Sequence, residues 1–183
     1  MRKIVVSTIV SLDGVQDNPQ NWSYHFWDEE HGQKASEILF ASDVLLMGRE
    51  TYEGFAAAWT QRSGDPFTDR INAMPKYVAS RTLSGELPWN TRVLEGELVP
   101  AVTELRKQDG GGILMYGCGP VSKELMQNGL VDEVKLWYNP VFAGEGQQVY
   151  DKSGDLPIMD LVKADSLKSG IVIVTYRPRN VAA

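Results

Sequence analysis

The segment DVLLMGRETYE, residues 43–53, joins a buried strand directly to a helix and constrains the fold more than any other part of the chain. Its four consecutive apolar residues, 44–47, are typical of a strand that is covered on both faces. Gly48, Arg49 and Thr51 follow at once, where a helix can begin. Such a helix start presents unpaired N–H groups and a partial positive charge, which suit a phosphate. The alternative is an ordinary strand–helix turn, because short motifs also match by chance.

A second turn of the same kind follows the predicted strand 113–116. Gly117 and Gly119 allow a ligand to approach the backbone, and Pro120 and Val121 can start the next helix. Two helix starts at the carboxyl edge of one sheet could hold a pyrophosphate between them. The spacing of the glycines is not the six-position dinucleotide fingerprint, which argues against a standard Rossmann fold. Cys118 would be reactive if the helix start lowered its pKa, or it is simply a small residue in a tight turn.

A third strand end, Ser80-Arg81, lies between these two turns in the sequence. A hydroxyl and an arginine at a strand end suit a phosphate monoester or the face of an adenine ring. If the pyrophosphate interpretation holds, this turn could read a ribose 2′-phosphate and select NADPH over NADH. The alternative for Arg81 is a solvated surface arginine.

The remaining pattern predicts an α/β fold in one domain, residues 1–183. Strands alternate with helices through the first 130 residues, and strands then follow strands, which favours a mainly parallel sheet with antiparallel strands added at the C-terminal end. The predicted strands are 3–10, 43–47, 76–79, 92–94, 113–116, 134–141, 161–167 and 171–176. The predicted helices are 28–40, 49–58, 99–107 and 121–128, with a short helical turn at 69–73.

Charge and composition exclude several function classes. The chain has 183 residues and a net charge of -6, without a basic run, so it is a poor candidate for binding nucleic acid or an anionic membrane. One cysteine and two histidines leave no disulfide and no cysteine-based zinc site, and we expect no metal. No stretch is long enough to span a bilayer, and we expect a cytoplasmic protein.

An aromatic loop at 15–27 and two acids are the candidates for substrate contacts and chemistry. Trp22 and Trp27 could stack on a flat substrate ring, although aromatic residues in a loop can equally cap the core. A carboxyl group near aromatic residues can have a raised pKa and relay a proton. Asp13 is the first candidate and Asp28 the second, and the alternative for Asp13 is a turn residue before Gly14.

Taken together, these pieces resemble the dihydrofolate reductase-like superfamily, and within it the reductase domain of the bifunctional riboflavin-biosynthesis deaminase-reductase. The resemblance covers nearly the whole chain. The motifs that carry it are SLDG at 11–14, MGRETYE at 47–53, SR at 80–81, YGCGP at 116–120, LVDEV at 130–134 and PVFAGEG at 140–146.

The resemblance implies a central eight-stranded, mainly parallel sheet, NADPH as hydride donor, a small pterin- or pyrimidine-like substrate, and a homodimer. It places the cofactor phosphates at Gly48, Arg49 and Thr51, and the pyrophosphate also at Gly117, Gly119, Pro120 and Val121. Ser80 and Arg81 would contact the adenosine and its 2′-phosphate, and the backbone of Thr8 and Ile9 would lie beside the nicotinamide. Asp13 would lie close to the meeting point of substrate and nicotinamide.

The chain departs from its relatives at the substrate end. The first helix carries Asp28, Glu29 and Glu30 only at its start, so no residue matches the carboxylate that engages a pterin. Residues 11–30 contain no basic cluster for a ribose phosphate, and no deaminase pattern is present. We therefore expect a stand-alone relative with a different substrate. The alternative is a non-catalytic nucleotide-binding or regulatory module. The apolar segment 134–141 is a candidate dimer face.

Overall fold

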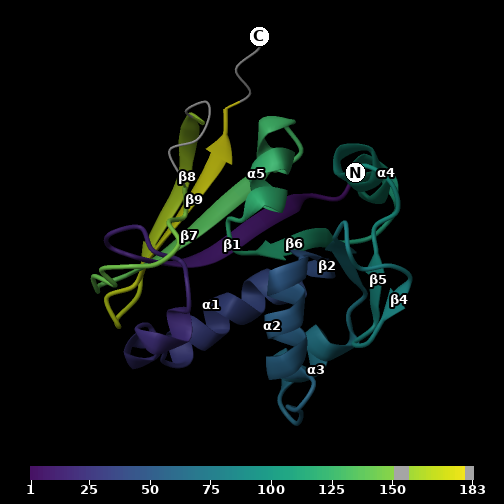
Figure 1. The fold of residues 1–183 in the computed structure, drawn as a ribbon. Helices are drawn as coiled ribbons and strands as arrows, with labels where there is room; N and C mark the ends of the chain where they lie inside the picture. Colours follow the sequence, from purple (N-terminus) through teal and green to yellow (C-terminus); the bar gives the residue numbers. More distant parts are fainter. Residues whose placement is uncertain (151–156, 180–183) are drawn as a thin grey trace.

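A computed structural model describes residues 1–150 and 157–179, and its strands form one sheet in the order β4-β5-β3-β2-β6-β1-β7-β9-β8 (Figure 1). The strands are β1 (Ile4–Ser11), β2 (Ser42–Gly48), β3 (Lys76–Ala79), β4 (Glu86–Leu87), β5 (Thr91–Val93), β6 (Gly112–Tyr116), β7 (Glu133–Asn139), β8 (Met159–Ser166) and β9 (Val172–Pro178). The helices are α1 (Glu29–Phe40), α2 (Arg49–Trp59), α3 (Pro66–Ala73), α4 (Leu98–Lys107) and α5 (Pro120–Gln127). Two short 3-10 helices, η1 (Pro19–Asn21) and η2 (Tyr24–Phe26), lie in the aromatic loop.

The predicted α/β class is confirmed, with one correction to the number of strands. Strands β5, β3, β2, β6, β1 and β7 run parallel, and β9 and β8 add antiparallel pairings at one side, as predicted. The described residues form nine strands in place of the predicted eight. The additional strand, β4, is only two residues long and pairs antiparallel with β5. Two residues are too few to show the alternation by which a strand is recognised in a sequence.

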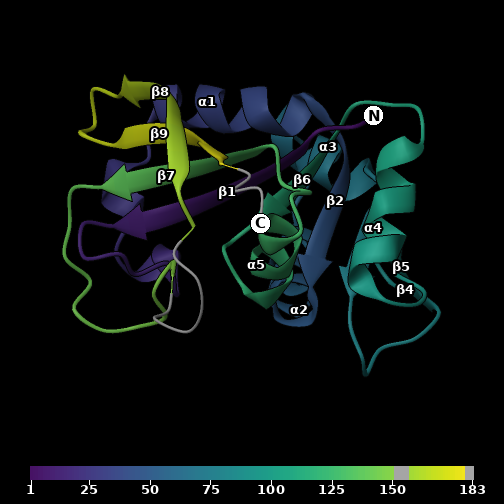
Figure 2. The ribbon, with the colours of Figure 1, turned by 90° about the horizontal axis from the view of Figure 1, so that it is seen from above.

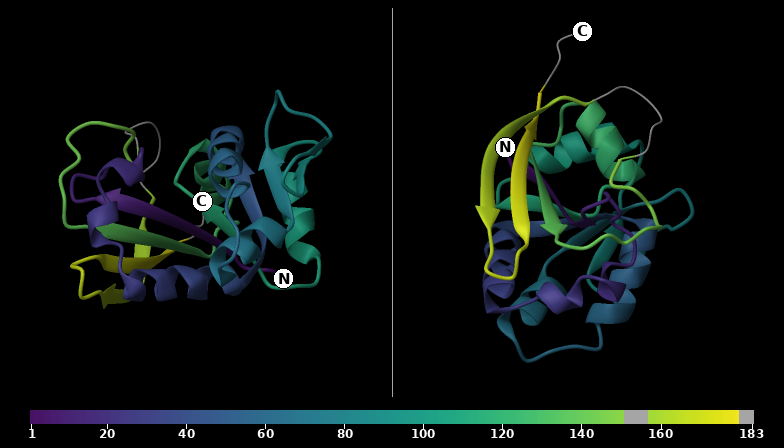
Figure 3. Two further views of the ribbon diagram at one scale, coloured as in Figure 1. Left: turned by 90° about the horizontal axis from the view of Figure 1, so that it is seen from below. Right: turned by 90° about the vertical axis from the view of Figure 1, so that its left-hand side faces the viewer.

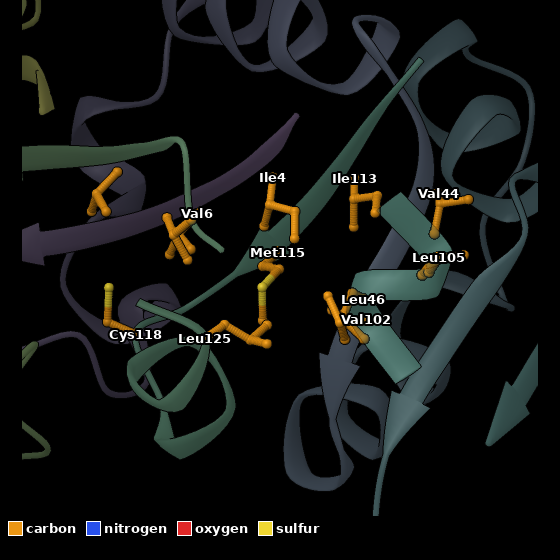
Figure 4. Close-up of a cluster of buried hydrophobic side chains, with 12 residues drawn as sticks. Ile4, Val6, Val44, Leu46, Val102, Leu105, Ile113, Met115, Cys118 and Leu125 are labelled. Carbon is orange, nitrogen blue, oxygen red and sulfur yellow. The ribbon is translucent and has the colours of Figure 1, made fainter. Parts of the chain in front are cut away.

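Helices cover both faces of the sheet, which explains the continuous apolar run of β2. Figures 1 and 2 show α4 and α5 on one face and α1, α2 and α3 on the other. Val44 and Leu46 pack toward α4 and α5, whereas Leu45 and Met47 pack toward α1, α2 and α3. Figure 4 shows the first of these clusters, with Leu125 of α5 beside the sheet residues. Successive side chains of a strand point to opposite faces, so both sets are buried.

A third apolar cluster lies under the C-terminal strands and corrects one expectation. Trp137 of β7 is almost completely buried there, against Leu167, Ile171 and Ile173. Figure 3 shows β7, β9 and β8 side by side at one end of the sheet. Trp137 is therefore a core residue of its own chain and is not available as part of a dimer face. Within the described ranges, no helix combines the length and the apolar character that crossing a membrane requires.

Candidate functional site

A cavity of about 2050 Å³ lies at the carboxyl ends of the parallel strands. The strand ends that line it include Ile9 of β1, Gly48 of β2, Ala79 of β3 and Tyr116 of β6. Helices α1 and α2 also contribute to its lining. Ligands of open α/β sheets bind in this position, because connecting turns and helix starts converge at the carboxyl edge.

The start of α2 forms one wall of this cavity. Gly48 is the N-cap residue of α2, and no side chain caps this helix end. Its first N–H groups are therefore available to a ligand. Arg49 and Thr51, for which the sequence predicts phosphate contacts, also line the cavity. A Cβ atom added to Gly48 would lie 3.4 Å from Cγ2 of Val121, so the first turn of α5 lies next to the N-cap residue of α2.

The start of α5 forms the adjoining wall. Gly117 adopts a φ of 83°, which favours glycine, and its N–H donates to the carbonyl of Ser7 at 2.9 Å. Gly119 is the N-cap residue, again without a side-chain cap. A Cβ atom added to Gly119 would meet no heavy atom within 4 Å. The structure thus leaves open space beside the backbone at this turn, and Pro120 and Val121 line the same cavity.

Gln16 fixes the second glycine turn, and sequence reasoning missed it. Its Oε1 accepts hydrogen bonds from the backbone N–H of Cys118 at 2.8 Å and from Oγ1 of Thr8 at 3.2 Å. Its Nε2 donates to the carbonyl of Cys118 at 3.1 Å. The loop after β1 and the turn after β6 are therefore held together by one side chain. Gln16 and Cys118 are about a hundred positions apart, and no local pattern signals such a contact.

Aromatic side chains form the other walls. On α2, Phe55 lies 5.3 Å from the ring of Tyr116. Trp59 lies 5.5 Å from the ring of Phe67 of α3. All four rings line the cavity. Phe55 and Trp59 are four residues apart and so share a helix face, a spacing that could have identified them in the sequence.

The wall formed by α1 carries a stacked histidine. The ring of His31 lies 4.8 Å from Trp27 in a nearly parallel stack and 5.0 Å from Trp137. Burial lowers the pKa of His31 below its usual value, against the opposing charge of Asp28. Burial also raises the pKa of Tyr116 well above its usual range. His31 and Tyr116, which both border the cavity, are thus uncharged near pH 7.

Asp13 stabilises a loop and does not line the cavity. Its carboxylate accepts hydrogen bonds from Oγ of Ser11 at 2.6 Å, from the N–H of Ala143 at 2.9 Å and from the N–H of Gly144 at 2.8 Å. These hydrogen bonds, with that of Ser11 foremost, lower the pKa of Asp13 to about 2. A carboxylate that is ionised at all physiological pH values is a poor proton donor. The geometry therefore argues against the catalytic role predicted for Asp13.

Asp28 also has a local structural role. Its Oδ1 accepts from the backbone N–H of His31 at 2.8 Å and so caps the start of α1. Asp28 borders a separate, smaller cavity of about 380 Å³ together with Lys168. It does not line the large cavity, so the geometry gives no support to a catalytic Asp28.

Three further predicted residues lie outside the cavity lining. Trp22 donates its indole N–H to the carbonyl of Asp17 at 3.0 Å. The hydroxyl of Ser80 accepts from the N–H of Leu83 at 3.0 Å, which closes a local turn. Arg81 is exposed, two residues beyond Ala79, which does line the cavity. The predicted residues that the structure brings together at the cavity are Thr8, Ile9, Trp27, Gly48, Arg49, Thr51, Gly117, Gly119, Pro120 and Val121.

Cys118 is not a reactive thiol. Its side chain is 4% exposed, and burial raises its pKa to about 12 despite the opposing charge of Lys123. The structure favours the alternative of a small residue that fits the turn, because desolvation outweighs the effect of the helix start.

The sequence matches a family model across most of its length. The model describes the RibD C-terminal domain and matches residues 2–173. A curated relative, the uncharacterized protein YyaP of Bacillus subtilis (strain 168), is 26% identical over 184 residues, which cover 96% of this chain and 94% of the relative.

Solved structures share the fold. A candidate riboflavin biosynthesis protein from Shewanella sp. PV-4 has a TM-score of 0.77 at 19% identity, over 97% of this chain and 99% of that one. A deaminase/5-amino-6-(5-phosphoribosylamino)uracil reductase from Thermotoga maritima has a TM-score of 0.68 at 16% identity, over 97% of this chain and 57% of that one. These similarities confirm the dihydrofolate reductase-like fold.

Proposed function

Because the chain belongs to the family of RibD C-terminal domains, we propose that it is an NADPH-dependent reductase that transfers a hydride to a small heterocyclic acceptor. The observation that carries the proposal is the pair of helix starts at Gly48 and Gly119, which are uncapped and border one cavity. Each such start attracts a phosphate through its N–H groups and its partial positive charge. Two adjacent starts of this kind can hold the two phosphates of a pyrophosphate.

The residues at the cavity fit a phosphorylated dinucleotide. The space beside Gly119 is open, and the contact between Gly48 and Val121 brings the two helix starts close enough to share one ligand. Arg49 adds a cation at the start of α2. The main chain of Thr8 and Ile9 at the end of β1 would lie beside the nicotinamide, and Arg81 would reach the 2′-phosphate.

NADPH supplies the hydride when bound, and the chain supplies position and a route for a proton. His31 and Tyr116 border the cavity as uncharged groups. A neutral imidazole can accept a proton at one nitrogen and release one from the other, so His31 can pass a solvent proton to the reduced acceptor. Asp13 has no place in this proposal, because it is ionised and turned toward the loop at Ala143.

A fluorescence titration with NADPH, followed by NADPH oxidation with pterin, pyrimidine and quinone acceptors, tests the proposal. We expect saturable NADPH binding and turnover of at least one acceptor class. Binding without turnover on every acceptor would favour a nucleotide-binding regulatory module instead. A protein that binds no NADPH would disprove both functions and leave only the fold.

We also propose a homodimer, formed through β8. This strand lies at the edge of the sheet, and its residues Leu161 and Val162 are 62% and 47% exposed. An edge strand presents unpaired backbone groups to which another chain can pair, and these two apolar side chains could pack beside it. A second copy of the same edge is the partner that the family resemblance suggests.

A further inference from the structure

The large cavity has one end that suits anions and another that does not. This inference rests on the proposed function, which assigns the helix starts at Gly48 and Gly119 to the cofactor. Those two starts have no side-chain cap. The rest of the cavity is bordered by α1, α3 and the body of α2, where the character of the wall changes.

The starts of the two helices that border this other end are already capped by carboxylates. Asp28, which lies outside the lining of the large cavity, caps α1 through the N–H of His31. Asp65 caps α3, where its Oδ1 accepts from the N–H of Thr68 at 3.0 Å and its Oδ2 accepts from the hydroxyl of Thr68 at 2.6 Å. A phosphate brought to either helix would meet a negative charge in place of free N–H groups.

Cationic side chains do not compensate for these carboxylates. Among the described residues that line the cavity, the only lysine or arginine side chains are those of Arg49 and Arg62, and Arg49 belongs to the cofactor end. Arg62 lies 5.2 Å from the ring of Trp59, so its guanidinium is placed over an aromatic face. Glu29 and Glu37 of α1 line the same cavity. A phosphate monoester would find one exposed arginine among several carboxylates.

Aromatic side chains supply flat, apolar surfaces at this end. Phe55 and Trp59 line the cavity from α2, and Phe67 lines it from α3. Trp27 and the uncharged ring of His31 line it from the side of α1. Aromatic faces of this kind bind planar rings through apolar contact and stacking.

We propose that the hydride acceptor is an uncharged planar ring system without a phosphate group, and that it binds between α1 and the Phe55–Trp59 face of α2. The reaction would move two electrons and one hydrogen as hydride from NADPH to the ring, with one proton from water, to give NADP⁺ and the reduced ring. A phosphoribosyl substituent on the acceptor is disfavoured by the carboxylates at this end.

Matched pairs of rings that differ only in charge test this assignment. Riboflavin and flavin mononucleotide share one ring and differ by a phosphate, and 1,4-naphthoquinone and its 2-sulfonate form a smaller pair. Binding is measured by calorimetry on the whole protein with NADP⁺ present and absent. We expect the neutral member of at least one pair to bind about tenfold or more tightly than the charged one, because an anion without a cationic partner loses hydration. Equal or tighter binding of the charged members, or no binding of either neutral ring, would overturn the inference.

Substitutions then locate the ring. Phe55→Leu and Trp59→Leu should each weaken the neutral ring about tenfold while the NADPH dissociation constant stays unchanged, since stacking is lost only at the acceptor end. Phe142→Leu is the matched control, because Phe142 is 74% exposed and does not line the cavity. In Arg62→Ala the neutral ring should still bind more tightly than the charged ring of the same pair. A selective loss of flavin mononucleotide binding in Arg62→Ala would show that the site binds a phosphate and would refute the proposal.

The same measurements separate this inference from the proposed function. If NADPH fails to bind but the neutral rings bind at Phe55 and Trp59, the reductase proposal is wrong and the ring site is real. If NADPH binds and neutral rings do not, the acceptor assignment is wrong and the cofactor site stands.

Discussion

Gly119→Ala gives the sharpest test of the cofactor end, because it should damage binding without damaging the fold. The backbone at Gly119 has a φ of -89° and a ψ of -171°, which alanine also adopts. The added methyl group would meet no heavy atom of the protein within 4 Å. An alanine N-cap costs a helix up to about 1 kcal/mol relative to glycine. We therefore expect a fall in Tm of no more than about 4 °C for a domain of this size.

The same methyl group would occupy the space through which a phosphate reaches the N–H groups of α5. A hydrogen bond to a charged group contributes about 1.5–3 kcal/mol. Loss of one such bond should weaken NADPH about 10- to 150-fold. Adenosine 2′-monophosphate lacks the pyrophosphate and should bind the variant and the original protein equally.

Fluorescence titration gives the dissociation constants, and calorimetric unfolding gives Tm. Gly32→Ala is the reference substitution, because an added Cβ atom there also meets no heavy atom within 4 Å and Gly32 lies in α1, which borders the acceptor end of the cavity and contains neither glycine turn. An unchanged NADPH dissociation constant in Gly119→Ala would refute the assignment of the pyrophosphate to this helix start. An equal loss of adenosine 2′-monophosphate would show that the effect is not specific to the pyrophosphate.

Four further substitutions probe other parts of the molecule. Arg81→Ala should weaken the binding of NADPH more than that of NADH, by about 1–3 kcal/mol. Equal losses for the two cofactors would show that Arg81 does not bind the 2′-phosphate. Burial depresses the pKa of His31 in the folded state, so the unfolded chain binds more protons and stability falls as the pH drops below the usual histidine value. His31→Phe should therefore flatten the dependence of Tm on pH between about 7 and 5, the range that includes the usual histidine pKa. An unchanged slope would contradict this expectation. Lys76 is buried, donates to the carbonyls of Asn72 and Met74 at 3.1 and 2.7 Å, and lies 4.2 Å from the ring of Trp89. Lys76→Met leaves these carbonyls unpaired and should lower the free energy of unfolding, measured by urea denaturation, by about 1–3 kcal/mol. Lys107→Met, at an exposed position, should leave the free energy of unfolding unchanged. Leu161→Asp on the edge of β8 should convert a dimer to a monomer in light scattering, and an unchanged mass would exclude β8 as the interface.

Burial of ionisable groups decides which of them can take part in chemistry. Cys118 and His31 both lie near the cavity, and burial keeps both uncharged at neutral pH. Asp13 is ionised for the opposite reason, since three hydrogen bonds stabilise its charged form. Similar positions near one strand edge thus carry very different protonation states.

The sequence alone predicted the parts of the site that depend on the main chain. A strand, a glycine and a helix start are local features, and the segments around Gly48 and Gly119 formed as predicted. The mainly parallel sheet followed from the alternation of strands and helices, with only the two-residue β4 missed. These features depend on hydrogen bonding between near neighbours and on hydrophobic period, which a sequence displays directly.

Only the tertiary structure decided which side chains reach the cavity. Asp13 turns away because its partners, Ala143 and Gly144, are supplied by a loop 130 and 131 positions along the chain. Gln16 holds the second glycine turn through a contact with Cys118 that spans 102 positions. Side-chain orientation and pKa depend on neighbours that only folding brings together, and no local pattern in a single sequence records them. For the same reason the sequence predicted a phosphate site and an aromatic contact at Trp27, whereas the aromatic wall of Phe55, Trp59 and Phe67 emerged only from the packing of α2 and α3.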